Sequence, residues 1–162
     1  MKNNTSKIVK CIFMAPVVLV LLAFIFCEVN KAYWDYRVDE MCAKDGGITI
    51  YEKVVISKSD YPNMKFISTG IPVLPFEERV NQDDPFFYRF SSNRIYKFIN
   101  LHVNRYEHLT MRNSDKKILA KGITYGRWGG DFPLGFESSR HHCNGQDERM
   151  RISESIITVK GE

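Results

Sequence analysis

The chain has 162 residues, which suits one domain of ordinary size, and its formal net charge is +4 at pH 7. That charge lies mainly at the start, because Lys2, Lys7 and Lys10 precede the first acidic residue, Glu28. With these lysines set apart from the 23 basic residues, 20 basic and 19 acidic residues remain, so the rest of the surface is balanced. A nucleic-acid-binding protein would show a basic footprint, so we predict no nucleic acid partner.

An uncharged apolar run, CIFMAPVVLVLLAFIFC, occupies residues 11–27. With Ile8 and Val9 it approaches the ~20 residues that cross a ~30 Å hydrocarbon core, and it lacks the polar stripe of a soluble helix. The lysines before it favour a cytoplasmic tail at 1–10, a transmembrane signal anchor at 11–27 and a periplasmic α+β domain at 28–162. We therefore expect a single-pass protein of the inner (cytoplasmic) membrane, with the lipid bilayer as a partner.

The end of this run differs from a cleavage site. Signal peptidase favours small residues before the cut, and a lipoprotein signal needs one before its cysteine, but Phe26 precedes Cys27. An uncleaved anchor is favoured, and lipidation at Cys27 stays open as the alternative.

Residues 28–43, EVNKAYWDYRVDEMCA, show apolar residues at helical spacing, and the Asp-Gly-Gly at 45–47 supplies a stop. We expect this helix to continue the membrane helix and to pack Val38 and Met41 on a sheet. The predicted fold class is α+β, with an antiparallel sheet of four to five strands and one disulfide.

Three aromatic residues, Tyr33, Trp34 and Tyr36, follow the apolar run by a turn or two. At 1.5 Å per residue Trp34 lies roughly 10 Å beyond Cys27, near headgroup level, where an indole is favoured. We predict a membrane-interface belt at these residues, with packing on the domain as the alternative.

Strands are predicted, in chain order, at 48–56, 86–90, 96–103, 105–112, 118–125 and 152–159. The polar NSDKK at 113–117 is expected to turn the chain as a hairpin. In the glycine-aromatic loop 125–135, YGRWGGDFPLG, Gly129 or Gly130 should have a positive φ. This loop has no phosphate-binding signature, and no cofactor is predicted.

Residues 57–86 contain four of the six prolines and form a predicted loop with one helical turn at 76–82. Long ordered loops often bind partners. The candidate partner-binding residues are its apolar side chains, Ile71, Val73, Leu74 and Phe76. The alternative is a connection that covers one edge of the sheet.

The stretch SSRHHCNGQDE, 138–148, raises the question of a metal or catalytic site. His141 and His142 are adjacent, so on a strand they point to opposite faces and do not easily share one metal ion. Cys42 and Cys143 are the two cysteines outside the apolar run, and in an oxidising compartment they most simply form one disulfide. The alternatives are a metal site at His141 and His142 and a nucleophilic Cys143.

WDYRVDEMCAKDGGITIYE at 34–52 and KILAKGITYGRWGGDFP at 117–133 resemble segments of a family of small, uncharacterised proteobacterial membrane-anchored or envelope proteins. In that family a W-D-x-x-V-D-x-x-C-x-K-D-G-G-like helix and turn follow a hydrophobic N-terminus, and a Y-G-R-x-G-G-D-like loop comes later. The resemblance spans most of residues 34–143. It implies no catalytic residue, and it agrees with an envelope location.

Three classes of function follow from these patterns. The favoured class is a protein-interaction or structural module of the cell envelope, with an envelope protein as partner. A prophage or mobile-element exclusion or immunity protein is the second, on size and topology. The third is a metal-dependent or hydrolytic enzyme that uses His141 and His142 with Asp131 and Glu137, although no hydrolase signature is present.

Overall fold

The computed structural model describes the backbone of residues 2–60, 64–66, 70, 72–73, 84–132, 138–143 and 148–160. It describes side chains from Met14 onward, apart from those of 148–151. The predicted helical turn at 76–82 lies outside the described residues.

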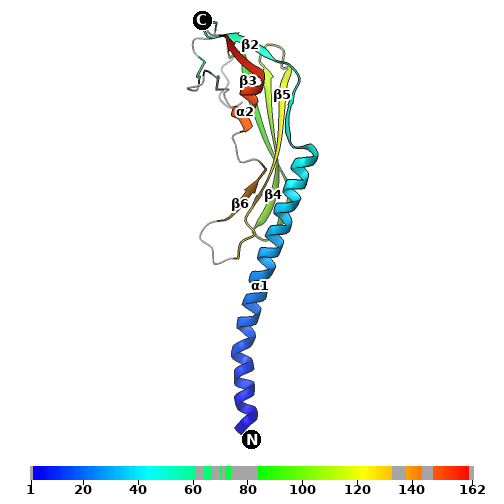
Figure 1. Ribbon diagram of the computed structural model, residues 1–162, viewed down its shortest axis with the longest axis vertical. Coiled ribbons are helices and arrows are strands. Elements are labelled where there is room, and N and C mark those ends of the chain that lie inside the picture. The colour runs from blue at the N-terminus through cyan, green and yellow to red at the C-terminus, as the bar shows by residue number, and fades with distance from the viewer. Residues whose placement is uncertain are drawn as a thin grey trace.

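One long helix, α1 (Lys2–Asp45), begins the chain and continues from the apolar run into the folded domain (Figure 1). Every side chain from Met14 to Phe26 is exposed, whereas the last third of the helix packs on the sheet. Within the described residues, this is the one helix long and apolar enough to cross a membrane. The structure therefore supports a single-pass membrane anchor that runs directly into the domain.

Five strands of the described chain form the main sheet, in the order β1-β5-β4-β3 with β6 also paired to β5, and all neighbours are antiparallel. Their bounds are β1 (Gly47–Ile50), β3 (Phe86–Phe98), β4 (Leu101–Arg112), β5 (Ile118–Trp128) and β6 (Arg140–His142). A second sheet pairs β2 (Val54–Ser57) in parallel with β7 (Ile157–Lys160), and the short helix α2 (Glu148–Ile156) leads into β7. The predicted α+β class with an antiparallel sheet is confirmed.

The two helices cover opposite faces of the main sheet, at different heights (Figure 1). On the face under α1, the cluster contains the fully buried Val38, Leu101 and Val103, with Met41 packed against them, as predicted. On the other face, at the end far from the membrane helix, Ile152 and Ile156 of α2 form a second cluster with strand residues. The part of that face nearer the membrane helix has no described helix over it.

Several predicted strand boundaries were wrong. The expected strand 48–56 is interrupted at 51–53, because the amides of Tyr51 and Glu52 both donate to the carbonyl of Leu119, and the chain then leaves for the second sheet. Within the expected strand 152–159, the first half is helical, since Ile152 and Ile156 lie one turn apart and bury the same helix face.

The expected strands 86–90 and 96–103 are also replaced. A single strand, β3, runs through to Phe98, and the chain turns at Ile99 and Asn100 before β4. Ile99 has a φ of 52° in this two-residue turn, at a position where glycine is usual, so the sequence carries no turn signal there. The NSDKK turn is confirmed, because β4 ends at Arg112 and β5 begins at Ile118.

Cys42 and Cys143 are joined in a disulfide, as predicted. Their Cα atoms are 6.2 Å apart, within the usual range of about 4.4–6.8 Å. The bond ties the end of α1 to the segment after β6, across a sequence separation of 101 residues. A loop of that size corresponds to about 4.7 kcal/mol in the chain-entropy model.

Candidate functional site

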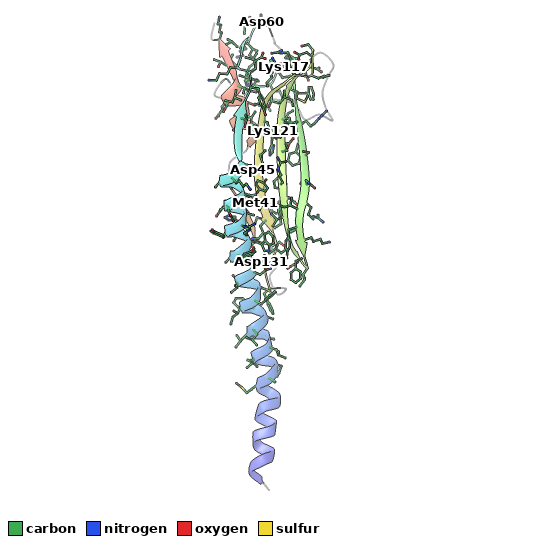
Figure 2. All side chains as sticks on the ribbon, turned by 90° about the vertical axis from the view of Figure 1, so that its right-hand side faces the viewer. Met41, Asp45, Asp60, Lys117, Lys121 and Asp131 are labelled. Carbon is green, nitrogen blue, oxygen red and sulfur yellow. A yellow bond between two sulfur atoms is a disulfide. The ribbon has the colours of Figure 1, made fainter. Side chains whose placement is uncertain are left out.

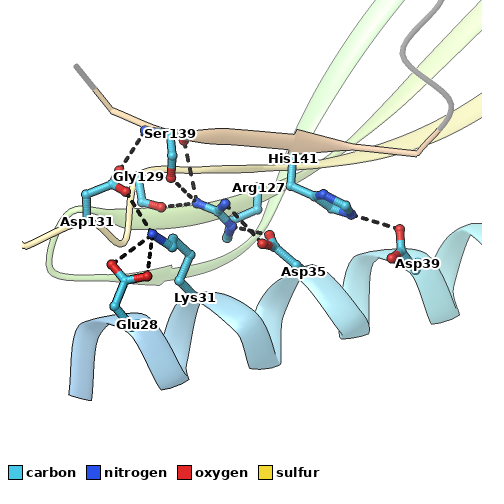
Figure 3. Close-up of polar contacts among 9 residues, drawn as sticks. All are labelled: Glu28, Lys31, Asp35, Asp39, Arg127, Gly129, Asp131, Ser139 and His141. Carbon is cyan, nitrogen blue, oxygen red and sulfur yellow. Dashed lines mark hydrogen bonds and ion pairs between the residues drawn. The ribbon is translucent and has the colours of Figure 1, made fainter. Parts of the chain in front are cut away.

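Two groups of side chains that could carry a function lie on opposite faces of the main sheet. The first is the helix–sheet ion cluster between α1 and the strands, drawn in Figure 3. The second is an aromatic and histidine-rich surface on the other face, on the part that α2 leaves open.

The ion cluster begins with charged residues of α1 at helical spacing. Glu28, Lys31, Asp35 and Asp39 follow one another at intervals of three or four residues, so their side chains share one face of the helix. Figure 3 shows these side chains directed at the end of β5, at β6 and at the loop between them. The helix–sheet interface therefore combines an apolar cluster around Val38 with charged side chains that run beside it along the helix.

Arg127 is the centre of the cluster and is 2% exposed. Its guanidinium donates to both carboxylate oxygens of Asp35, and the bond from Nη2 to Oδ2 measures 3.3 Å. It also donates to the carbonyl of Gly129 and, at 3.1 Å, to the hydroxyl of Ser139. A buried charge that is paired with one carboxylate and donates to two further polar atoms is a structural cation.

Asp131 and Lys31 extend the cluster toward the membrane end. The Lys31 ammonium lies 2.8 Å from a carboxylate oxygen of Glu28 and 3.4 Å from Asp131. The bond to Glu28 raises the pKa of Lys31. Burial alone would raise the pKa of Asp131, but hydrogen bonds from Ser139 and Lys31 bring it below its ordinary value. The Asp131 carboxylate is therefore ionised and already bound to Ser139 and Lys31, an arrangement that does not suit a general base.

The two histidines of the RHHC stretch point to opposite faces of β6, in agreement with the strand geometry expected for neighbours. His141 Nε2 lies 2.8 Å from Asp39 Oδ1 in the ion cluster. His142 lies on the other face, and its imidazole occupies the space that a Cβ at Gly126 would need. Among the described residues, no group of three or more histidine, cysteine or acidic side chains is arranged to hold a metal ion.

The second group lies on the face of β3, β4, β5 and β6 turned away from α1. Alternate strand residues share a face, so His102, Asn104, Tyr106 and His108 of β4 lie opposite Leu101. We call this surface the aromatic–histidine face; it comprises Phe90, Arg94, Lys97, His102, Asn104, Tyr106, His108, Trp128, Arg140 and His142.

Ring contacts run across the aromatic–histidine face from strand to strand. Phe90 lies against Tyr106 with ring centroids 5.9 Å apart, and Tyr106 lies 6.0 Å from His142. The indole of Trp128 donates a 2.8 Å hydrogen bond to the Tyr106 hydroxyl, and the guanidinium of Arg140 lies 4.1 Å from the Trp128 ring centroid. These contacts join the rings of three neighbouring strands and of β6 into one network.

The charges on the aromatic–histidine face have one sign. None of the described strand residues that share this face is acidic, and Glu107 of β4 lies on the opposite face beside Arg105. Burial lowers the pKa of His102, and the charges of Arg94 and Lys97 lower it further. The pKa of His142 is lowered by burial and by neighbouring cationic groups. Burial and the neighbouring positive charges therefore favour the neutral form of both imidazoles.

Most of the remaining predicted site residues lie outside the described part of the chain. Ile71, Leu74, Phe76 and Glu137 lie outside the described residues. Val73 is half-buried, and its amide donates to the carbonyl of Lys65 at 2.6 Å.

The predicted interface aromatics divide between packed and exposed positions. Trp34 stacks on Tyr96 with ring centroids 3.9 Å apart and belongs to the core under α1. Tyr33 and Tyr36 are exposed. The membrane-interface belt stays a prediction for these residues.

Neither the pair of Arg127 and Asp35 nor the aromatic–histidine face was predicted from the sequence. The four charged residues of α1 at helical spacing were an available signal for the ion cluster. For the face, the alternation His102, Asn104, Tyr106, His108 along one strand was available once the strand boundaries were known.

Comparison with known proteins gives no assignment. No family model matches the chain, and searches of curated proteins and of solved structures find no significant match.

Proposed function

We propose that the protein is a membrane-anchored interaction module of the bacterial envelope, with its N-terminal tail in the cytoplasm and its domain in the periplasm. The three lysines before the apolar run support this orientation, and a disulfide within the domain suits an oxidising compartment. The resemblance to small envelope proteins agrees with the same location.

The aromatic–histidine face carries the proposal. Tryptophan, tyrosine and arginine dominate the binding energy of protein interfaces, and the face presents Trp128, Tyr106 and Arg140 in one contiguous contact network. Its cations and the absence of described acids fit a partner segment rich in acidic residues, since charge complementarity steers association and selects the partner. The partner is therefore an envelope protein with an acidic, aromatic-binding segment.

The helix–sheet ion cluster supports a structural role for the opposite face. Arg127, Asp35, Asp131 and Lys31 are all engaged in ion pairs that join α1 to the sheet. One face of the sheet would then bind the partner, while the other face is held against α1. This arrangement is expected of a module whose binding surface is attached firmly to its membrane helix.

Site-specific photo-crosslinking in native membranes tests the proposal. A photoreactive phenylalanine analogue at Phe90 should form an adduct with one partner protein, whereas the analogue at Tyr51, an exposed aromatic outside the face, should not. Arg94→Glu should lower the yield at Phe90 severalfold by repelling an acidic partner, and Lys53→Glu, at an exposed cation off the face, should leave it unchanged. Equal adducts at Phe90 and Tyr51, or a yield indifferent to Arg94→Glu, would overturn the proposal.

A further inference from the structure

The end of the domain nearest the membrane helix carries apolar side chains at the level of the apolar run. Phe132, in the loop after β5, lies against Phe24 of α1 with ring centroids 6.0 Å apart. Phe24 lies three residues before the end of the uncharged run at Cys27, so its Cα is about 4.5 Å inside that end. Its side chain leans further toward the N-terminus of the helix. The domain therefore begins inside the segment that crosses the bilayer.

The turn between β3 and β4 lies at the same end of the domain. Its residue Ile99 is 77% exposed, the highest exposed fraction of any large hydrophobic side chain described, and the neighbouring Phe98 is also exposed. Figure 2 shows this end of the sheet beside the helix near Asp131, whereas Lys117 and Asp60 lie at the far end. A β-branched residue with a φ of 52° is an uncommon choice for an exposed turn in water.

The turn and the loop are fixed to one another and to α1. Asn100 donates from its side chain to the carbonyl of Asp131 at 3.0 Å, and Asp131 pairs with Lys31 of the helix. Gly129 has a φ of 74°, and a Cβ there would overlap the carbonyl oxygen of Asn100. The turn and the loop that carry the apolar residues are thus joined to each other and to α1.

We propose that Phe98, Ile99 and Phe132 form a membrane foot, which inserts into the lipid leaflet on the domain's side next to α1. Its partner is the acyl-chain region of the bilayer, because the group is continuous with a residue of the transmembrane run. The charged pair of Lys31 and Asp131 lies directly above, at the level where a headgroup region begins. The inference rests on the membrane anchoring in the proposed function and is independent of the aromatic–histidine face.

Nitroxide accessibility on the full chain in lipid vesicles tests the foot. Cys11 and Cys27 are first replaced by serine, and a nitroxide is attached at Ile99→Cys. Matched labels are placed at Leu19→Cys, an exposed site in the apolar run, and at Val55→Cys, an exposed site in the second sheet. In hydrocarbon a nitroxide collides more with oxygen than with a water-soluble nickel chelate. We expect position 99 to resemble position 19, and position 55 to show the opposite preference; Phe98→Cys provides a second reading of the foot.

Three outcomes would overturn the foot, and they differ in what else they affect. Position 99 behaving like position 55, while position 19 stays in hydrocarbon, would remove the foot and keep the anchor. Position 99 shielded from both reagents would mean that protein, not lipid, covers the turn. Position 19 accessible to the nickel chelate would remove the anchor and the foot together.

Discussion

The pair of Asp35 and Arg127 gives the sharpest energetic prediction. Asp35→Ala leaves the guanidinium of Arg127 buried, with hydrogen bonds to Gly129 and Ser139 but no opposite charge. Removing one partner of a buried pair costs about 3–5 kcal/mol. Since the Asp35 side chain is 29% exposed, water reaches part of the pair, so we expect the lower end, about 3 kcal/mol.

Asp39→Ala is the matched control on the same helix face. Asp39 pairs with His141, but its side chain is 61% exposed, so its loss should cost under about 1 kcal/mol. Urea unfolding of the full chain in detergent, followed by the fluorescence of Trp34 and Trp128, measures both variants. Asp35→Leu combined with Arg127→Met should recover most of the loss, because no unpaired charge stays buried. Costs for Asp35→Ala and Asp39→Ala that agree within about 0.5 kcal/mol would refute the reasoning.

Two further predictions concern a glycine and an acid. Gly129→Ala should lower the free energy of unfolding by about 1–3 kcal/mol more than Gly47→Ala does. Both glycines have a positive φ, but only at Gly129 does a backbone atom, the Asn100 oxygen, stand where the Cβ would lie. Equal costs for the two variants would contradict this close approach. The hydrogen bond from Arg105 lowers the pKa of Glu107 below its ordinary value of 4.5. The ionised Glu107 therefore contributes stability above pH 4.5, and this contribution is lost as the pH falls through the lowered pKa of the folded state. Urea midpoints measured from about pH 6 to 3 should therefore fall less steeply in Glu107→Gln than in the wild type, and parallel curves would exclude this contribution.

The parts of the fold that the sequence predicted are those in which one strong local signal decides. The uninterrupted apolar run and the helical spacing after it predicted α1, and the polar NSDKK predicted the turn between β4 and β5. The chemistry of the W-G-G-D turn predicted a positive φ at Gly129 or Gly130, and both residues have one. The disulfide came from cysteine number and compartment together.

The errors arose where tertiary contacts outweigh local preference. Ile99 occupies a turn position that favours glycine, so the long hairpin of β3 and β4 was divided wrongly. The isoleucines at 152 and 156 are β-branched and suggested a strand, but they bury one face of a helix on the sheet. The ion cluster required knowing that Arg127 lies beside α1, which no residue spacing specifies because Asp35 and Arg127 are 92 positions apart.

The attachment of α1 to the sheet determines how the domain meets the membrane. Three contacts of different chemistry lie along the helix: the disulfide at Cys42, the buried ion pair at Asp35 and the ring contact at Phe24. Because they are spread over 18 positions of one continuous helix, the domain cannot pivot about a single point. The long strands run alongside the helix (Figure 1). If α1 crosses the bilayer along its normal, both faces of the sheet stand perpendicular to the membrane surface. A partner of the aromatic–histidine face would therefore approach along the membrane surface, which favours another membrane-associated protein over a freely diffusing one.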